Sequence, residues 1–350
     1  MQISIFLGLL FWNLAQLLPK KLILFLGRSV CVGLLAFFVL CSVRKQTNNG
    51  AIMSLKTASA NPDSQALADL RVRIDRLDAA LHDLLLERAD VIDQIRKLKS
   101  KQVLCLRPGR EAQILRTLTA RPQGKLPEGL VVRLWREMIS AFTQQEAPFK
   151  VAVTTPAKGE HLWDLARDYF GAFTPLIEAP SAREAVKLAQ AEKAVLALVP
   201  FPQDGEKDSW WSLLAGDKKN TLSICAAVPF ETLKVGRGNA RHAVPGGLVL
   251  GPLYPELTGD DRSFLALHCA HVPESEMKRL LGKAGYKLLQ LLSHTTGRGE
   301  SAPTLFLAEV EGYIGRADTR LSRLRAMLGS RLQHLTPMGG YPAPLKSGRR

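Results

Sequence analysis

A long apolar stripe interrupted by one arginine most constrains how this chain can fold. The residues of the stripe recur at alternating spacings of three and four, which places them on one face of a helix and turns that face toward a partner helix. The stripe consists of Leu67, Leu70, Ile74, Leu77, Leu81, Leu84, Arg88, Val91, Ile95 and Leu98. A guanidinium group keeps its charge and is costly to bury alone. Arg88 therefore needs an anion, from the protein or from a ligand, unless it lies at the rim and extends its head to water.

Three helices are predicted in this region. The first extends from Ser64 to Lys101 and is about 55 Å long at about 1.5 Å per residue. Two shorter helices are predicted over Arg110–Ala120 and Pro127–Glu146, joined by a loop at Pro122–Pro127. Two short neighbours cannot cover so long an apolar face, so we expect pairing with a second copy of the chain.

Helical geometry places Arg88 and Lys99 on the same side of the first helix. The two residues are eleven positions apart, so they point within about 20° of each other and lie about 16 Å apart along the axis. Two long cationic side chains at this spacing can reach one small anion. Arg71 lies about 25 Å from Arg88 along the axis and about 100° around it, so it cannot join that site within one subunit. An antiparallel partner could deliver Arg71, which predicts a pocket built from two chains.

Further charged residues lie at the ends of the two shorter helices. Arg110 and Glu111 open the second helix, and Glu146 closes the third. Each has a purely structural alternative, because an acid in a first turn suits the helix dipole and a terminal glutamate can be solvated. Considered together with Arg88 and Lys99, they indicate a site for a small anionic ligand.

Five sequence blocks within residues 65–147 resemble the all-helical, or type II, chorismate mutases. The blocks are LRVRIDRLD at 70–78, LLLERA at 84–89, IRKLK at 95–99, RPGREA at 107–112 and WREMISA at 135–141. Their order and spacing are those of the family. By this resemblance, the positions of the family's substrate-contacting residues are occupied by Arg71, Arg88, Lys99, Arg110, Glu111 and Glu146.

Two positions depart from the family pattern. Arg107 stands where the family often has an acid, so any contact it makes must come from its backbone or differ in kind. Phe142 stands where the family usually has a small residue, which predicts a narrower pocket. Both remain in the expected substrate-binding set, together with Arg71, Arg110 and Glu111.

The resemblance also implies the chemistry, which is the rearrangement of chorismate to prephenate. Chorismate is a dicarboxylate that arginine side chains can clamp, and its pericyclic rearrangement needs no nucleophile, metal or cofactor. The enzyme has to hold the substrate folded and stabilise negative charge on the breaking ether oxygen. Arg88 and Lys99 are the expected catalytic cations. Glu146 can help only when protonated, and Glu111 is expected to accept a hydrogen bond from the ring hydroxyl.

The region from 149 to 262 resembles the opening of prephenate dehydratase domains. Strands and helices alternate here, which is typical of an α/β unit with parallel strands. Strands are predicted at 149–154, 175–179 and 194–199, and helices at 160–170 and 181–191.

Residues 263–342 resemble the regulatory ACT domain that is attached to such dehydratases. The predicted element order is βαββαβ, which is typical of a ferredoxin-like α+β fold, and residues 343–350 form a tail. After a strand near Phe264, the elements are expected at 274–283, 287–293, 304–311 and 319–328, with a final strand before Gly339–Pro342.

The signature residues of these two families are altered. Asp261-Arg262-Ser263-Phe264 replaces the dehydratase Thr-Arg-Phe, and Thr154–Gly159 replaces a glycine-rich turn. Leu292–Thr296 replaces the Glu-Ser-Arg-Pro motif that the ACT-containing dehydratases use for phenylalanine. A fold does not carry an activity when its site residues are missing. We therefore expect a degenerate region that supports the mutase dimer or senses another ligand.

The first 52 residues are apolar and basic, and residues 53–64 form a polar tail. The run at 22–43 has the length of a membrane span but contains Arg28. Three alternatives remain open: translation from Met53, a membrane anchor through 22–43, and export, although no positive region precedes the first apolar run as a signal peptide requires. Five cysteines without CxxC or metal spacing indicate a reduced, cytosolic protein without a metal.

The net charge of +15 fits a small acidic ligand, because no basic-aromatic motif for nucleic acid is found and a basic surplus attracts anions of any kind. The fold expected from the sequence is multidomain: an all-α chorismate mutase domain, then a dehydratase-like α/β region, then an ACT-like region. The expected function is that of a homodimeric chorismate mutase. One alternative is a bifunctional chorismate mutase/prephenate dehydratase, and another is a non-catalytic regulatory dimer that binds a ligand.

Overall fold

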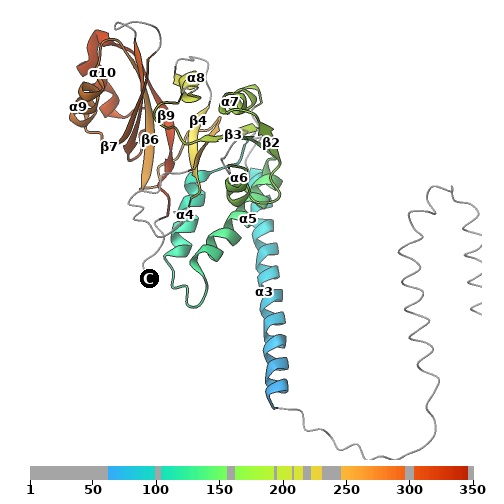
Figure 1. Ribbon diagram of the computed structural model, residues 1–350. Coiled ribbons are helices and arrows are strands. Elements are labelled where there is room, and N and C mark those ends of the chain that lie inside the picture. The colour runs from blue at the N-terminus through green and yellow to red at the C-terminus, as the bar shows by residue number, and fades with distance from the viewer. Residues whose placement is uncertain are drawn as a thin grey trace, which may run out of the picture. The chain divides into compact units, whose positions relative to one another are not determined.

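The computed structural model describes most of the chain after residue 61 (Figure 1). The described ranges are 62–98, 104–155, 162–192, 195–206, 209–215, 222–230, 246–295 and 303–345. The predictions for residues 1–52, and for Lys99, fall outside them. The chain divides into two compact units, residues 1–77 and 78–350. Within the described ranges, no helix combines the length and the apolar character that a membrane span requires.

Helix α3 (Pro62–Leu98) is the long helix that the stripe predicts. It begins two residues before the predicted start, at a proline, which suits a first helical turn because no backbone N–H is needed there. Its apolar stripe is largely uncovered: the residues from Leu67 to Leu84 on the stripe are between 49% and 61% exposed. None of the residues that the structure describes buries that face.

Helices α4 (Pro108–Thr119) and α5 (Glu128–Glu146) confirm the two shorter predicted helices within two residues at each end. Pro108 opens α4 for the same reason that Pro62 opens α3. Leu115 of α4 and Val132 of α5 are buried in one core with Phe149 and Val151. The two helices are thereby fixed against the sheet that follows.

One half of the sheet is the predicted α/β unit with additions. Strand β1 (Lys150–Thr154) lies between β2 (Leu176–Ala179) and β3 (Val195–Pro200), and both pairs are parallel, as predicted. Helices α6 (Leu162–Phe170) and α7 (Ala182–Ala191) are also confirmed. Three elements were not predicted, namely α8 (Trp211–Ala215), β4 (Ser223–Val228) and β5 (Gly247–Gly251). Strand β5 pairs antiparallel with both β3 and β4.

The other half has the predicted βαββαβ order. Its elements are β6 (Asp261–Cys269), α9 (Glu274–Ala284), β7 (Leu288–Thr295), β8 (Thr304–Glu311), α10 (Thr319–Leu328), a short 3₁₀ turn η2 (Gly329–Arg331) and β9 (Leu332–Pro342). These strands pair antiparallel in the order β9-β6-β8-β7, the ferredoxin-like arrangement. Helices α9 and α10 cover one face through a core that includes Leu267, Leu281 and Leu324 (Figure 1).

The last strand corrects one prediction. Gly339–Pro342 was expected to follow the final strand, but β9 continues through it to Pro342. Gly339 has φ +94° and pairs with Ile224 of β4, and a Cβ atom at this position would lie within 2.3 Å of the Ile224 carbonyl oxygen. Only glycine allows that close approach. Through this contact the strands form one nine-stranded sheet in the order β2-β1-β3-β5-β4-β9-β6-β8-β7.

Candidate active site

A cavity of about 250 Å³ lies among the C-terminal half of α3, the start of α4 and the end of α5. It gathers six of the eight site residues proposed from the sequence: Arg88, Arg107, Arg110, Glu111, Phe142 and Glu146. Lys99 lies outside the described residues. Arg71 is an exposed residue of the other unit, and its delivery by a partner remains a prediction. The remaining lining includes apolar side chains such as Ile92 and Ile139.

Arg88 presents a cation to this cavity without a protein anion to neutralise it. Its Nη1 atom is buried and has no hydrogen-bond partner within the described part of the chain. The guanidinium carbon of Arg88 lies 4.7 Å from the ring centroid of Phe142. This cation–π contact fixes the orientation of the guanidinium group. Partial burial lowers the pKa of Arg88 from its ordinary value. A buried donor left without an acceptor is a costly arrangement that a ligand anion would relieve.

Glu111, in the first turn of α4, is held by a residue that the sequence analysis missed. Its Oε2 atom accepts a hydrogen bond of 2.6 Å from Nη1 of Arg136, on α5, and both side chains are buried. Burial raises the pKa of Glu111, although the charge of Arg136 opposes the rise. Arg136 lies inside the WREMISA block at 135–141, but the block gives no sign that Arg136 pairs with Glu111. Helical periodicity alone does not show which neighbour a side chain meets.

Arg107 uses its side chain for a contact far along the chain. Its Nη2 atom lies 2.7 Å from Oε1 of Glu256, in the segment between β5 and β6. On the next turns of α4, Arg116 donates to Thr258 Oγ1 and to the carbonyl oxygens of Asp260 and Ala343. The segment between β5 and β6 is thereby tied to α4. The side chain of Arg107 is thus engaged by Glu256, and the substrate contact expected of Arg107 remains a prediction.

The cavity suits a small ligand with more than one negative group. Three arginines and two glutamates line a space with apolar walls, and the Nη1 donor of Arg88 has no partner among the described residues. Guanidinium groups match the geometry of carboxylates and bind them through paired hydrogen bonds. These arginines are therefore suited to binding an anionic ligand. Among the described residues, no group of three or more His, Cys, Asp or Glu side chains is placed to hold a metal ion.

Comparisons with known proteins match the helical part of the chain. The family model described as chorismate mutase type II matches residues 70–147. A bifunctional chorismate mutase/prephenate dehydratase of Pseudomonas aeruginosa is 34% identical over 115 residues, which are 31% of this chain and 31% of that protein. The protein of the same name from Neisseria gonorrhoeae is 30% identical over 136 residues, 39% of this chain and 37% of that protein. The chain thus spans less than half the length of the curated relatives it matches.

The sheet region has a distant likeness among solved structures. The X-ray structure of prephenate dehydratase from Streptococcus mutans aligns with a TM-score of 0.38 and 16% identity, over 56% of this chain and 100% of that chain. A likeness at this level assigns no function. The helical match is specific, and its boundaries enclose the cavity residues just described. Residues 70–147 of this chain are a domain of the type II chorismate mutase family.

Proposed function

We propose that this chain is a chorismate mutase, which rearranges chorismate to prephenate in the biosynthesis of phenylalanine and tyrosine and needs no cofactor or metal. The observation that carries the proposal is the Nη1 donor of Arg88, which has no partner among the described residues and lies in a cavity that Arg110 also lines. A dicarboxylate substrate supplies anions for both arginines. The family match over residues 70–147 supports the same reaction.

The proposed mechanism assigns a role to each group. Arg88 and Arg110 hold the carboxylates, with Arg71 arriving from the partner subunit, so that the substrate is bound folded and its reacting ends are close. Lys99 donates to the ether oxygen as negative charge develops on it, and a protonated Glu146 adds a second donor. Glu111 accepts from the ring hydroxyl through the oxygen that Arg136 does not use. Phe142 keeps Arg88 in place and narrows the space around the ligand.

The test is to incubate the purified protein with chorismate and identify the product. Accumulation of prephenate is the expected result. Formation of phenylpyruvate would support the bifunctional alternative, and unchanged chorismate would support the non-catalytic dimer. Proton NMR of the reaction mixture distinguishes all three compounds without a coupled enzyme.

The structural roles of the altered signature residues favour the mutase over the bifunctional alternative. Asp261 accepts hydrogen bonds from the backbone N–H groups of Thr258 and Gly259, and Ser263 donates to the Gly312 carbonyl oxygen. Arg262 approaches the buried Glu309, 3.6 Å away. These side chains are engaged in holding the sheet. We therefore propose that the dehydratase-like and ACT-like regions together have a supporting or sensing role and no dehydratase activity.

The reaction is expected to depend on the donor that Glu146 supplies to the ether oxygen. Glu146→Ala removes that donor, so kcat/KM should fall by ~10²–10³, whereas Glu146→Gln keeps an N–H donor and should retain more of the activity. Glu137→Gln, a change on the same helix outside the cavity, is the matched control and should keep the wild-type kcat/KM. Wild-type kcat/KM in Glu146→Ala would remove Glu146 from this role.

We further propose that the protein works as a homodimer that covers the exposed stripe of α3. Leu81 and Leu84 are 59% and 61% exposed, and a run of such leucines is the kind of surface that a second copy of the helix buries. The same pairing would deliver Arg71. We also propose a location in the cytoplasm, which accords with the buried, free thiols of Cys225 and Cys269.

Introducing charge into the stripe is expected to separate the subunits. In the double variant Leu81→Glu/Leu84→Glu, like charges would face each other across the paired helices, so sedimentation velocity should show a monomer. Mutase activity should be lost with it, because Arg71 no longer reaches the site. Gln94→Glu, an exposed change off the stripe, is the control. A double variant that stays dimeric at the same protein concentration would contradict the proposed interface.

A further inference from the structure

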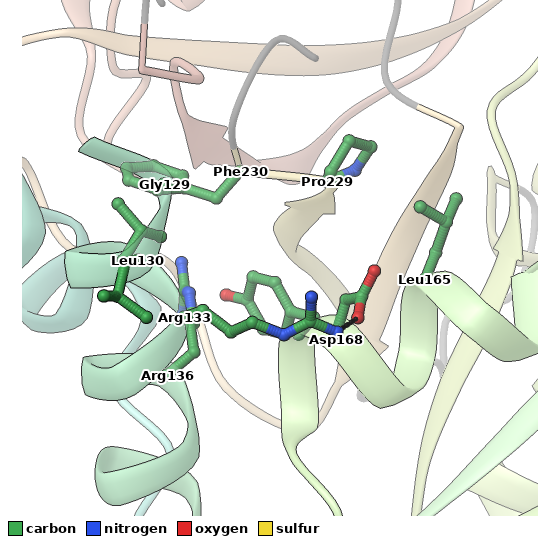
Figure 2. Close-up of a pocket in the computed structure, with 10 residues that line it drawn as sticks. Gly129, Leu130, Arg133, Arg136, Leu165, Asp168, Pro229 and Phe230 are labelled. Carbon is green, nitrogen blue, oxygen red and sulfur yellow. Dashed lines mark hydrogen bonds and ion pairs between the residues drawn. The ribbon is translucent and has the colours of Figure 1, made fainter. Parts of the chain in front are cut away.

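A second cavity, of about 390 Å³, lies between α5, α6 and the segment that follows β4 (Figure 2). It shares no lining residue with the candidate active site. Its volume is within the range of roughly 300–1,000 Å³ that is usual for small-molecule sites. The walls are mainly apolar and include Leu130, Leu165, Pro229 and Phe230. These walls fit an apolar body about as large as an aromatic ring with a short chain.

A buried cation with an unused donor forms part of the wall. Arg136 is 4% exposed, and its Nη2 atom has no hydrogen-bond partner among the residues that the structure describes. Its guanidinium carbon lies 4.0 Å from the ring centroid of Tyr169 and 5.0 Å from that of Phe230. These two rings fix the plane of the guanidinium. A buried guanidinium nitrogen in this state is suited to an incoming carboxylate.

A second cation lies at the surface of the same cavity. Figure 2 shows Arg133 reaching from α5 toward Asp168 on α6, where Nη2 lies 2.9 Å from Oδ1. The two side chains are 77% and 54% exposed. An exposed pair of this kind contributes little to stability, because water screens it. Arg133 can therefore exchange Asp168 for a ligand carboxylate at little cost.

We propose that this cavity binds a small carboxylate with an apolar body, and that its occupant alters the candidate active site through Arg136. The carboxylate accepts from Arg136 Nη2 and from Arg133, while the body packs against Leu130 and Leu165. Nη1 of the same guanidinium holds Glu111, which lines the candidate active site. An anion bound to Arg136 competes with Glu111 for the same positive charge. This competition weakens the hydrogen bond between Arg136 and Glu111. The binding stands on this cavity alone, and the effect on turnover rests on the proposed function.

Isothermal titration calorimetry of the full chain tests the binding, with 3-phenylpropanoate as the probe. Saturable binding is expected, and 3-phenylpropan-1-ol, which has the same body without the carboxylate, should bind at least about tenfold more weakly. Leu165→Trp fills the cavity and should abolish binding, whereas Leu188→Trp on α7 should not. Arg133→Ala, a change at an exposed position that leaves the core intact, should weaken binding several-fold. Equal binding of acid and alcohol, binding that survives Leu165→Trp, or no binding at millimolar probe would overturn the proposal.

Two further readouts separate this proposal from the proposed function. Arg88→Ala should leave the calorimetric signal unchanged, because Arg88 lines only the other cavity; loss of the signal would place the probe there and contradict the proposal. Saturating 3-phenylpropanoate should change the rate of chorismate turnover in wild type and leave the rate of Leu165→Trp unaffected. Binding without any change in rate would overturn the coupling through Glu111. If the protein does not turn over chorismate, the proposed function fails, and the calorimetry still decides the binding.

Discussion

Arg88→Ala is expected to lower kcat by ~10²–10³, the usual cost of removing one preorganised group that stabilises transition-state charge. The variant should not lose stability, since the Nη1 atom of Arg88 is buried without a partner among the described residues and its removal deletes an unsatisfied donor. Activity should therefore fall without a matching loss of stability. Steady-state kinetics with chorismate and thermal unfolding of the same preparation measure both.

Three variants accompany this experiment. Arg96→Ala removes an exposed cation on the same helix that is paired with Asp93 at 2.7 Å, so kcat should stay at the wild-type value. Arg88→Lys keeps the charge but loses the planar guanidinium group with its paired N–H donors, so it should keep only part of the activity. Lys99→Ala is expected to lower kcat as Arg88→Ala does. Wild-type turnover in Arg88→Ala or in Lys99→Ala would refute the role of that cation.

Breaking the buried pair between Glu111 and Arg136 is expected to have the largest effect on stability. Arg136→Leu leaves the Glu111 carboxylate buried without its cation, and such a change costs about 3–5 kcal/mol. Glu111→Leu leaves the guanidinium in the same position and should cost a similar amount. The double variant Glu111→Leu/Arg136→Leu removes both charges, so it should be more stable than either single variant.

Urea unfolding followed by tryptophan fluorescence measures these differences, because Trp135 and Trp163 lie on α5 and α6 near the pair. Arg133→Ala is the matched control: it is one turn away on α5, its pair with Asp168 is exposed, and its loss should cost ~0–1 kcal/mol. A cost below about 1 kcal/mol for Arg136→Leu, or a double variant that loses the sum of the two single costs, would show that the pair does not hold this part of the fold.

The sequence predicted the helices well because their signals are local. The alternation of three and four residues along α3, the proline that opens α4 and the βαββαβ order are all read from short windows. Strands β4 and β5 were missed, although both are almost entirely buried, because a short buried strand has no alternating pattern to reveal it. The continuation of β9 beyond Gly339 was missed because it depends on a close contact with Ile224, which is far away in the sequence.

Local sequence patterns also predicted part of the candidate site, but not its long-range contacts. Cations on one helix face could be placed relative to each other, and the cavity does gather Arg88, Arg110 and Glu111. The partners of Arg136 and Arg107 could not be predicted. Arg107 meets Glu256 across 149 residues of sequence, and periodicity holds no information about such pairs. These long-range partners decide which side chains remain available to a ligand.

A crystal structure of the protein with a bicyclic diacid that mimics the rearranging substrate would show where the substrate binds. We expect the mimic inside the cavity among α3, α4 and α5, with one carboxylate within hydrogen-bond distance of Nη1 of Arg88. A mimic bound elsewhere on the molecule, or bound in that cavity without contact to Arg88, would contradict this expectation.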